Sequence, residues 1–175
     1  MPRFNQLSFL LFTILLAAVI LSGCTQSEEE VLAETETAVE EEFSAQPAEP
    51  NKTTKLMEFY VPENMSMESE DGNNFVLAEE DQQYLLFFNQ LEDEASEALY
   101  KDIARAEESL LLESFKEDGR FGFIKVISVG DNGYEVITGI GGAKITAETE
   151  RDELAEDSRK MMKIIRSIQK KEQKE

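Results

Sequence analysis

Residues 121–140 read FGFIKVISVGDNGYEVITGI, and this stretch decides the fold. Two apolar runs, Phe121–Val129 and Tyr134–Ile140, flank a Gly-Asp-Asn-Gly sequence at 130–133. Such a turn between runs of β-branched and aromatic residues is typical of a β-hairpin. Apolar residues fill both alternating sets of positions in the first run, so we expect both faces of its sheet to be covered.

Further extended segments are expected on both sides of this hairpin. Their apolar patterns and turn residues predict strands or short extended pieces at Leu56–Val61, Met65–Met67, Phe75–Ala78, Gln83–Asn89 and Ala143–Ala147. Links as short as these join antiparallel strands.

Two stretches have helical periodicity, namely Glu94–Lys116 and Glu150–Lys170. The first carries apolar residues at three- and four-residue spacing, with Gly119 placed to end it, and Thr149 is a candidate cap for the second. The sequence therefore predicts an α+β fold, an antiparallel sheet of five to seven strands with a helix packed on each face, as a three-layer sandwich.

The N-terminus has the order of parts found in bacterial lipoprotein signals. Arg3 precedes a mostly apolar run from Leu7 to Leu21, and Leu21-Ser22-Gly23-Cys24 follows as a lipobox. A bilayer span needs about 20 apolar residues, so this shorter run is typical of a signal-peptide core. We expect cleavage after residue 23, lipidation of Cys24, and anchoring at the extracytoplasmic face of a bacterial membrane.

The segment after Cys24 is acidic and poor in apolar residues up to about residue 52. A segment of this composition buries too little surface to offset its chain entropy, so it is predicted to be a disordered tether over 24–52. A short helix around Glu28–Val39 is the alternative, marginal by itself. Residues 53–175 are then expected to form one globular domain.

Composition argues against most catalytic chemistry. The chain has a formal net charge of −20, no His, and one Cys. The lack of His removes the usual general base and the commonest metal ligand, and the charge repels nucleic acid. We therefore expect no enzyme activity, no cofactor and no nucleic-acid partner.

Several clusters are candidate sites, each with a simpler structural interpretation. The glycines of Gly139-Ile140-Gly141-Gly142 predict a tight turn or bulge, because no helix follows to hold phosphate. Abundance alone explains most carboxylate groupings, and turn chemistry explains the possible calcium ligands. The remaining candidates are the carboxylates Glu79-Glu80-Asp81, Glu107-Glu108 and Asp152-Glu153; the calcium ligands Asp71, Asn73, Asn74, Asp131 and Asn132; the basic set Arg159, Lys160, Lys163, Arg166, Lys170, Lys171 and Lys174; and the methionines Met57, Met65, Met67, Met161 and Met162.

The order of these elements resembles the PsbP-like fold family, which includes DcrB-type bacterial lipoproteins. The resemblance covers roughly residues 55–170 and rests on Phe59-Tyr60-Val61-Pro62, the hairpin Phe121–Ile140 and the run Met161–Ile168. It implies a binding or assembly role without catalysis, and it assigns no site residues.

These observations lead to two functional expectations. The first is a membrane-anchored, non-catalytic interaction or assembly module that meets another envelope protein. The alternative is a lipoprotein that binds a small ligand or a cation such as calcium. A deep polar cleft would favour the ligand, and a broad exposed apolar patch would favour the protein partner.

Overall fold

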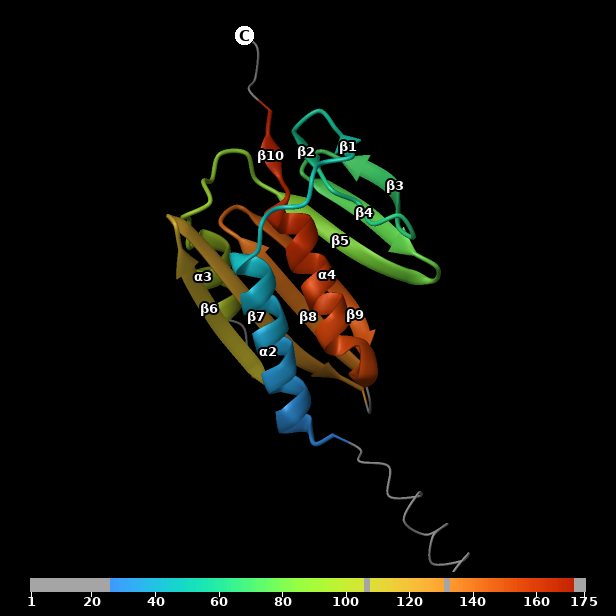
Figure 1. Cartoon of the computed structure of the whole chain (residues 1–175), viewed down its shortest axis with the longest axis vertical. Helices are drawn as coiled ribbons and strands as arrows, with labels where there is room; N and C mark the ends of the chain where they lie inside the picture. Colours follow the sequence, from blue (N-terminus) through green and yellow to red (C-terminus); the bar gives the residue numbers. More distant parts are fainter. Residues whose placement is uncertain (1–25, 106–107, 131–132, 172–175) are drawn as a thin grey trace, which may run out of the picture.

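The computed structural model describes residues 26–105, 108–130 and 133–171. At its centre is a seven-stranded antiparallel sheet with the strand order β3-β4-β5-β9-β8-β7-β6 (Figure 1). The strands are β3 (Ser66–Asp71), β4 (Asn74–Glu79), β5 (Gln82–Phe88), β6 (Leu111–Glu117), β7 (Arg120–Val129), β8 (Gly133–Ile140) and β9 (Ala143–Glu150). The predicted fold class, α+β with an antiparallel sheet of five to seven strands, is confirmed.

The hairpin on which that prediction rests is present as β7 and β8. Val129 pairs with Gly133 beside the turn, and Gly122 pairs with Ile140 at the other end. Residues 131 and 132 of the turn lie outside the described part of the chain.

The strand predicted at Leu56–Val61 is shorter and does not join the main sheet. It forms β2 (Met57–Phe59), the middle strand of a small antiparallel sheet with β1 (Lys52–Thr53) and β10 (Gln169–Lys170). The small sheet therefore ties the beginning of the predicted domain to the end of the chain.

Over the described residues 26–52, the prediction of a disordered tether is wrong, and its alternative, a helix around Glu28–Val39, is confirmed. Residues Glu28–Ser44 form the helix α2, which begins with a capping box made by Ser27 and Glu30. Its buried side chains recur every three or four residues and pack on the main sheet and on a second helix: Val31, Thr35, Ala38, Val39 and Phe43. A narrow apolar stripe is enough to stabilise α2 because it packs against the apolar face of the sheet. The folded domain thus includes α2, well before the predicted boundary at residue 53.

The helix predicted at Glu94–Lys116 is also wrong over most of its length. Among the described residues of this range, only Ala98–Ala104 is helical, as α3, and Leu111–Glu117 forms the edge strand β6. Leu111 and Phe115 are four residues apart, and this spacing puts two side chains on one face of a strand as well as of a helix. Both side chains join the main core from β6.

The last helix, α4 (Leu154–Arg166), is shorter than the predicted Glu150–Lys170 and follows the 3₁₀ turn η1 (Arg151–Glu153). Thr149 belongs to β9 and makes no cap. Leu154, Met161 and Ile165 are buried at three- and four-residue multiples along α4, and they form its inner side.

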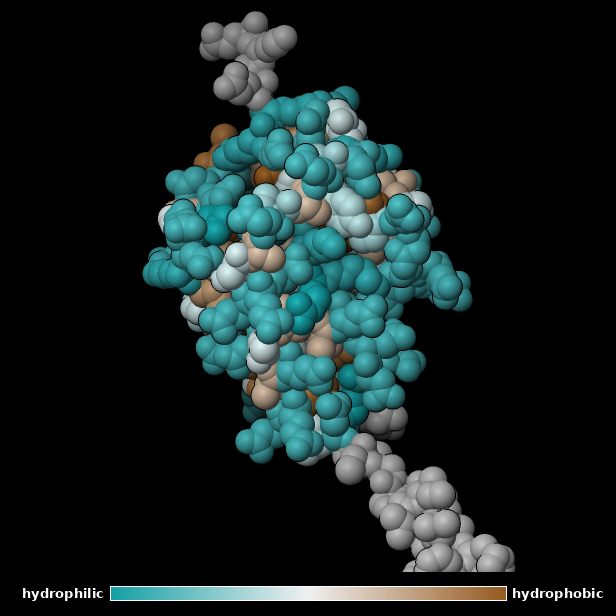
Figure 2. All heavy atoms as spheres, viewed as in Figure 1, coloured by the Kyte–Doolittle hydropathy of each residue, from teal (hydrophilic) through white to brown (hydrophobic). Residues whose placement is uncertain are grey.

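The helices are distributed unevenly over the sheet. The long helices α2 and α4 lie side by side on one face, and the short α3 lies on the other (Figure 1). The outer side of the two long helices is largely hydrophilic (Figure 2). Among the described residues, no helix is long and apolar enough to cross a membrane.

Candidate functional site

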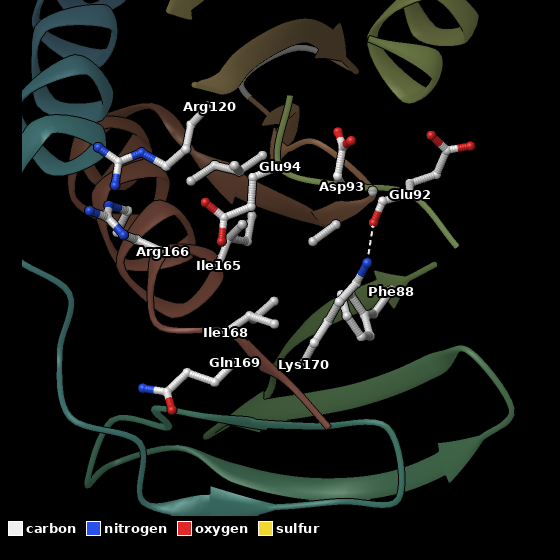
Figure 3. Close-up of a pocket in the computed structure, with 13 residues that line it drawn as sticks. Phe88, Glu92, Asp93, Glu94, Arg120, Ile165, Arg166, Ile168, Gln169 and Lys170 are labelled. Atoms are coloured by element: carbon white, nitrogen blue, oxygen red, sulfur yellow. Dashed lines mark hydrogen bonds between the residues drawn. The ribbon is translucent and has the colours of Figure 1, made fainter. Parts of the chain in front are cut away.

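A cavity of about 320 Å³ lies where the end of α4 meets the β8–β9 turn and the segment that follows β5 (Figure 3). This volume is at the lower end of the range of about 300–1,000 Å³ that is usual for small-molecule sites. The side chains around it come from four separate parts of the chain, so the tertiary fold assembles it.

The glycines at 141 and 142 shape one wall of this cavity. Gly141 has a φ of +53°, in the left-handed region that favours glycine. A Cβ atom on Gly141 would collide with the backbone of Asp93, and one on Gly142 would meet the Cβ of Glu92 at 2.5 Å. The predicted tight turn is therefore confirmed, and its second role is to let the segment after β5 cross directly over it.

Apolar side chains line the interior side of the cavity. Phe88 comes from the end of β5, Ile140 from the end of β8, and Ile165 and Ile168 from the last turn of α4 and just beyond. Phe88, Ile140 and Ile165 also belong to the main core. The cavity is thus an opening onto the core, where apolar ligand atoms would be shielded from water.

Two arginines face the cavity on its other side. Arg120 begins β7 and Arg166 ends α4, and their guanidinium groups lie close together (Figure 3). Arg166 Nε donates a hydrogen bond to the carbonyl oxygen of Phe43, at 3.2 Å, and the Arg120 guanidinium lies over the Phe43 ring, 5.6 Å from its centroid. Phe43 at the end of α2 therefore positions both arginines.

The protein has a net charge of −20, but at this pair two positive charges lie close together. Burial lowers the pKa of Arg166, and the charge of Arg120 lowers it further. Within the described residues, Arg166 makes no ion pair, because no carboxylate oxygen comes within 4.0 Å of its guanidinium. Two neighbouring cations held in a partly dry site favour the binding of an anion.

The three acidic residues beside the cavity do not all face it. The Glu92 carboxylate accepts a hydrogen bond from Ser96 Oγ at 2.5 Å, and the Asp93 carboxylate accepts one from Ala95 N at 3.0 Å. Both groups therefore serve the turn that leads to α3. Only Glu94 points toward the arginines, and Lys170 Nζ donates to the Glu92 carbonyl at 2.6 Å (Figure 3).

A second polar cluster surrounds Asp157 on α4, at the other end of the sheet. The Asp157 carboxylate accepts hydrogen bonds from Tyr84 OH at 2.8 Å and Thr149 Oγ1 at 2.5 Å, and it pairs with Lys160 at 3.2 Å. Lys160 also forms an ion pair with Glu79, which belongs to the predicted carboxylate cluster Glu79-Glu80-Asp81. The Asp157 side chain is only 5% exposed and each of its oxygens has a partner, so the cluster is a structural network.

Burial raises the pKa of Tyr84, and the hydrogen bond to Asp157 raises it further. Burial alone would lower the pKa of Lys160, but the hydrogen bond from Lys160 to Glu79 and the charges of Tyr84 and Asp157 raise it. Near neutral pH, Tyr84 therefore stays protonated and Lys160 charged, and neither group is a base. Sequence reasoning missed Tyr84 and Asp157, because they come together only when α4 packs on the sheet.

The other candidate residues predicted from the sequence have structural roles or lie outside the residues that the structure describes. Asp71 pairs with Asn74 around the β3–β4 turn, which supports the turn interpretation of the calcium candidates. The described residues contain no group of three or more acidic, His or Cys side chains placed to hold a metal ion. Four of the five methionines are buried core residues, and Met67 packs against the core. The candidates that lie outside the residues described by the structure are Glu107, Asp131, Asn132, Lys174 and the lipobox with Cys24.

Most of the basic set is paired within the molecule. Arg159 binds Glu41 on α2, Lys171 Nζ donates to the Thr54 carbonyl, and Lys163 lies over the Tyr60 ring. Within this set, Arg166 and Lys170 line the cavity. Arg120 was not predicted as a site residue. Its only sequence signal is its place at the start of a strand, and its proximity to Arg166 needs the fold.

Comparisons with known proteins leave the family open. No protein-family model matches the chain, and no curated protein is significantly similar to it. The resemblance to the PsbP-like family therefore stays a prediction.

Proposed function

We propose that this protein is a lipid-anchored lipoprotein at the extracytoplasmic face of a bacterial membrane, and that it binds a small ligand without catalysis. The observation that supports ligand binding most is the cavity with Arg120 and Arg166 on one side and core residues on the other. An apolar interior with a few convergent polar groups is the usual design of a small-molecule site. The lipobox at Leu21–Cys24 supports the anchor.

The position of α2 gives this proposal a defined geometry. Only residues 25–27 separate Cys24 from the first residue of α2. Three residues of extended chain span about 10 Å, so the lipid would hold the domain close to the membrane and not on a long tether. The anchored end is the start of α2, where Tyr134 OH donates to Glu28 at 3.1 Å.

The cavity lies at the opposite end of α2, beside Phe43. A helix of 17 residues is about 25 Å long, so the cavity would open well away from the lipid surface. A ligand would then enter from the space outside the membrane and not from the bilayer.

The anchor is tested by mass spectrometry of the protein isolated from its native membrane. We expect a diacylglyceryl group on Cys24 at the mature N-terminus, and release or lack of processing in Cys24→Ala. An unmodified Cys24 in membrane-bound protein would contradict the anchor.

Ligand binding is tested by thermal denaturation of the full lipoprotein with a panel of small metabolites. A true ligand at a hundredfold excess over its dissociation constant stabilises the folded state by about 2.7 kcal/mol. Ile168→Trp should fill the cavity and abolish the shift, whereas Leu85→Trp, on the opposite face of the sheet from α4, should leave it unchanged. If no panel member raises the melting temperature, the ligand-binding proposal fails.

A protein partner is the second candidate, and one observation favours it. Leu85 on β5 is 52% exposed on the sheet face that α3 covers only in part. Crosslinking in native membranes with a photoreactive residue at position 85 tests this candidate. A single specific adduct, lost in Leu85→Asp, would favour the partner over the small ligand.

A further inference from the structure

We infer that the cavity binds a small organic carboxylate with an apolar chain or ring, with its carboxylate on Arg120 and Arg166. This inference rests on the proposed ligand-binding function and specifies the chemistry of the ligand. It is based on an incompletely satisfied arginine, a like-charge pair, and the apolar surface beside them.

Arg120 is the first element of the argument. Its side chain is only 12% exposed, and its Nε is buried without a hydrogen-bond partner among the described residues. It forms long ion pairs with Glu117 at 3.6 Å and Asp118 at 3.8 Å, and both distances exceed that of a hydrogen bond. A guanidinium has five N–H donors, and burying them without acceptors is unfavourable. Arg120 therefore has donors to offer to a ligand.

The second element is the proximity of Arg166. Only its Nε is used, for the carbonyl oxygen of Phe43, so its terminal nitrogens make no hydrogen bond within the described chain. Repulsion between two neighbouring guanidinium groups is relieved by an anion that both can contact. The planar fork of a guanidinium matches a carboxylate, which can accept two parallel hydrogen bonds.

Glu94 restricts the anion to a low charge. Its carboxylate points toward the arginine pair, and its charge acts on Arg166 (Figure 3). Because Glu94 offsets part of the positive charge, the two arginines cannot neutralise an anion of charge −2, such as a phosphate monoester, which also costs more to remove from water than a carboxylate of charge −1. The arrangement therefore favours a monocarboxylate.

The apolar part of the ligand has its own surface. Ile140, Ile165 and Ile168 lie next to the arginine pair, and Phe88 continues this surface toward β5. Burial of each CH₂ group there favours binding, because it removes apolar surface from water. A carboxylate without a chain uses only half of the site, and an uncharged chain leaves the arginines unsatisfied.

The experiment measures the binding of octanoate to the full lipoprotein in lipid nanodiscs by isothermal titration calorimetry. Two comparison probes divide the ligand: acetate has the head group alone, and 1-octanol has the chain alone. Inorganic phosphate serves as the doubly charged anion. Arg166→Gln and Arg120→Gln remove the proposed head-group contacts, and Arg105→Gln is the matched control because Arg105 is exposed and its ion pair among the described residues is with Asp102. Empty nanodiscs correct for partition into the lipid.

We expect octanoate to bind at least tenfold more tightly than acetate, 1-octanol or phosphate. Each glutamine variant at position 120 or 166 should weaken octanoate at least tenfold, and Arg105→Gln should match the wild type. Arg166→Lys keeps the charge but not the fork, and should be intermediate. Unchanged melting temperatures without ligand show that the variants fold, and a variant that unfolds is replaced by its lysine counterpart.

Three results would overturn the inference: equal affinity for octanoate and 1-octanol, affinity for phosphate that matches octanoate, or octanoate binding that survives loss of both arginines. If octanoate fails while another metabolite binds and is blocked by Ile168→Trp, the carboxylate inference is wrong and the proposed function stands. If nothing binds in the cavity, both fail.

Discussion

The two faces of the seven-stranded sheet are covered to very different degrees. On one face, α2 and α4 bury a continuous core that reaches from Phe75 on β4 to Phe115 on β6. On the other face, α3 covers a small cluster formed by Ile103, Phe121, Phe123 and Ile137. The difference shows that apolar residues on both sides of a strand predict two covered faces, but not how much of each face is covered.

One row of side chains across the sheet makes this difference visible. Val76, Leu85, Thr146, Ile137 and Lys125 are successive cross-strand partners from β4 to β7. Lys125 is buried, and its Nζ donates to the carbonyl oxygen of Ile103 on α3, whereas Leu85 is half-exposed at the far end. The second face is therefore shielded from solvent mainly where α3 covers it.

The largest expected effect is the loss of α2. A chain of residues 53–175 lacks α2 and exposes the core face of β6 and β7 together with one side of α4. Val39 and Phe43 are each almost fully buried, and each buried side chain of this size stabilises the fold by about 1.5–3 kcal/mol. We expect no cooperative urea unfolding for 53–175, and a sharp transition for 26–175. Equal stability of the two chains would restore the tether interpretation.

The second effect is that of a single core residue in α2. Phe43 packs on Phe115, with ring centroids 5.9 Å apart, and a Cβ on Gly122 would lie only 2.7 Å from the Phe43 ring. The Phe43→Ala substitution should therefore leave a cavity and lower the free energy of unfolding by about 3–5 kcal/mol. Chemical denaturation measures this, and a change below about 0.5 kcal/mol, typical of surface sites, is incompatible with the observed packing.

A smaller effect is expected on the second face. Ile103 on α3 is buried against Phe121 and Phe123, but α3 has only seven residues and is open to solvent around it. Relaxation of so short a helix should partly close the space left by Ile103→Ala, so we expect a loss near the lower limit, about 2 kcal/mol. The same denaturation experiment compares it with Phe43→Ala. A loss larger than that of Phe43→Ala would reverse the ranking of the two faces.

Alkaline pH should lower the free energy of unfolding through Tyr84 and Lys160, which contact each other beside α4. The folded-state pKa values of Tyr84 and Lys160 are both raised, so the folded protein holds protons that the unfolded chain releases above about pH 10. This contribution to stability is fully present below that pH and is lost as the pH rises further. Denaturation at pH 9 to 11 should show the fall, and Tyr84→Phe should make it shallower. A pH slope that is the same in Tyr84→Phe as in the wild type would exclude a contribution from Tyr84.

The smallest effect belongs to the uncovered end of the second face. Leu85→Thr keeps β-propensity and changes a half-exposed side chain, so the free energy of unfolding should shift by no more than about 0.5 kcal/mol. Its matched control is Leu86→Thr, the next residue along β5, which faces the main core and should be strongly destabilising. Equal losses at positions 85 and 86 would show that this part of the second face is also covered.

The sequence was most informative where the signal is local. The turn residues at 130–133 and the apolar runs beside them define the β7–β8 hairpin, and the glycines at 141 and 142 indicate the next turn. It was least informative at α2. The acidic composition of this segment predicted disorder, although five residues at helical spacing form the stripe that is buried in the structure: Val31, Thr35, Ala38, Val39 and Phe43. The capping box at Ser27 and Glu30 was a second available signal.

The sequence by itself determined the α+β class and the hairpins, because turn geometry and side-chain alternation act over a few residues. It also determined the tight turn at Gly141, because few other residues adopt a φ of +53°. Only the tertiary structure decided that Leu111–Glu117 is an edge strand and that α2 and α4 share one face, because such choices depend on which apolar surface is left to be buried. The pairing of Arg120 with Arg166 depends on tertiary structure in the same way, since 46 positions separate residues that meet only when α4 packs on β8 and β9.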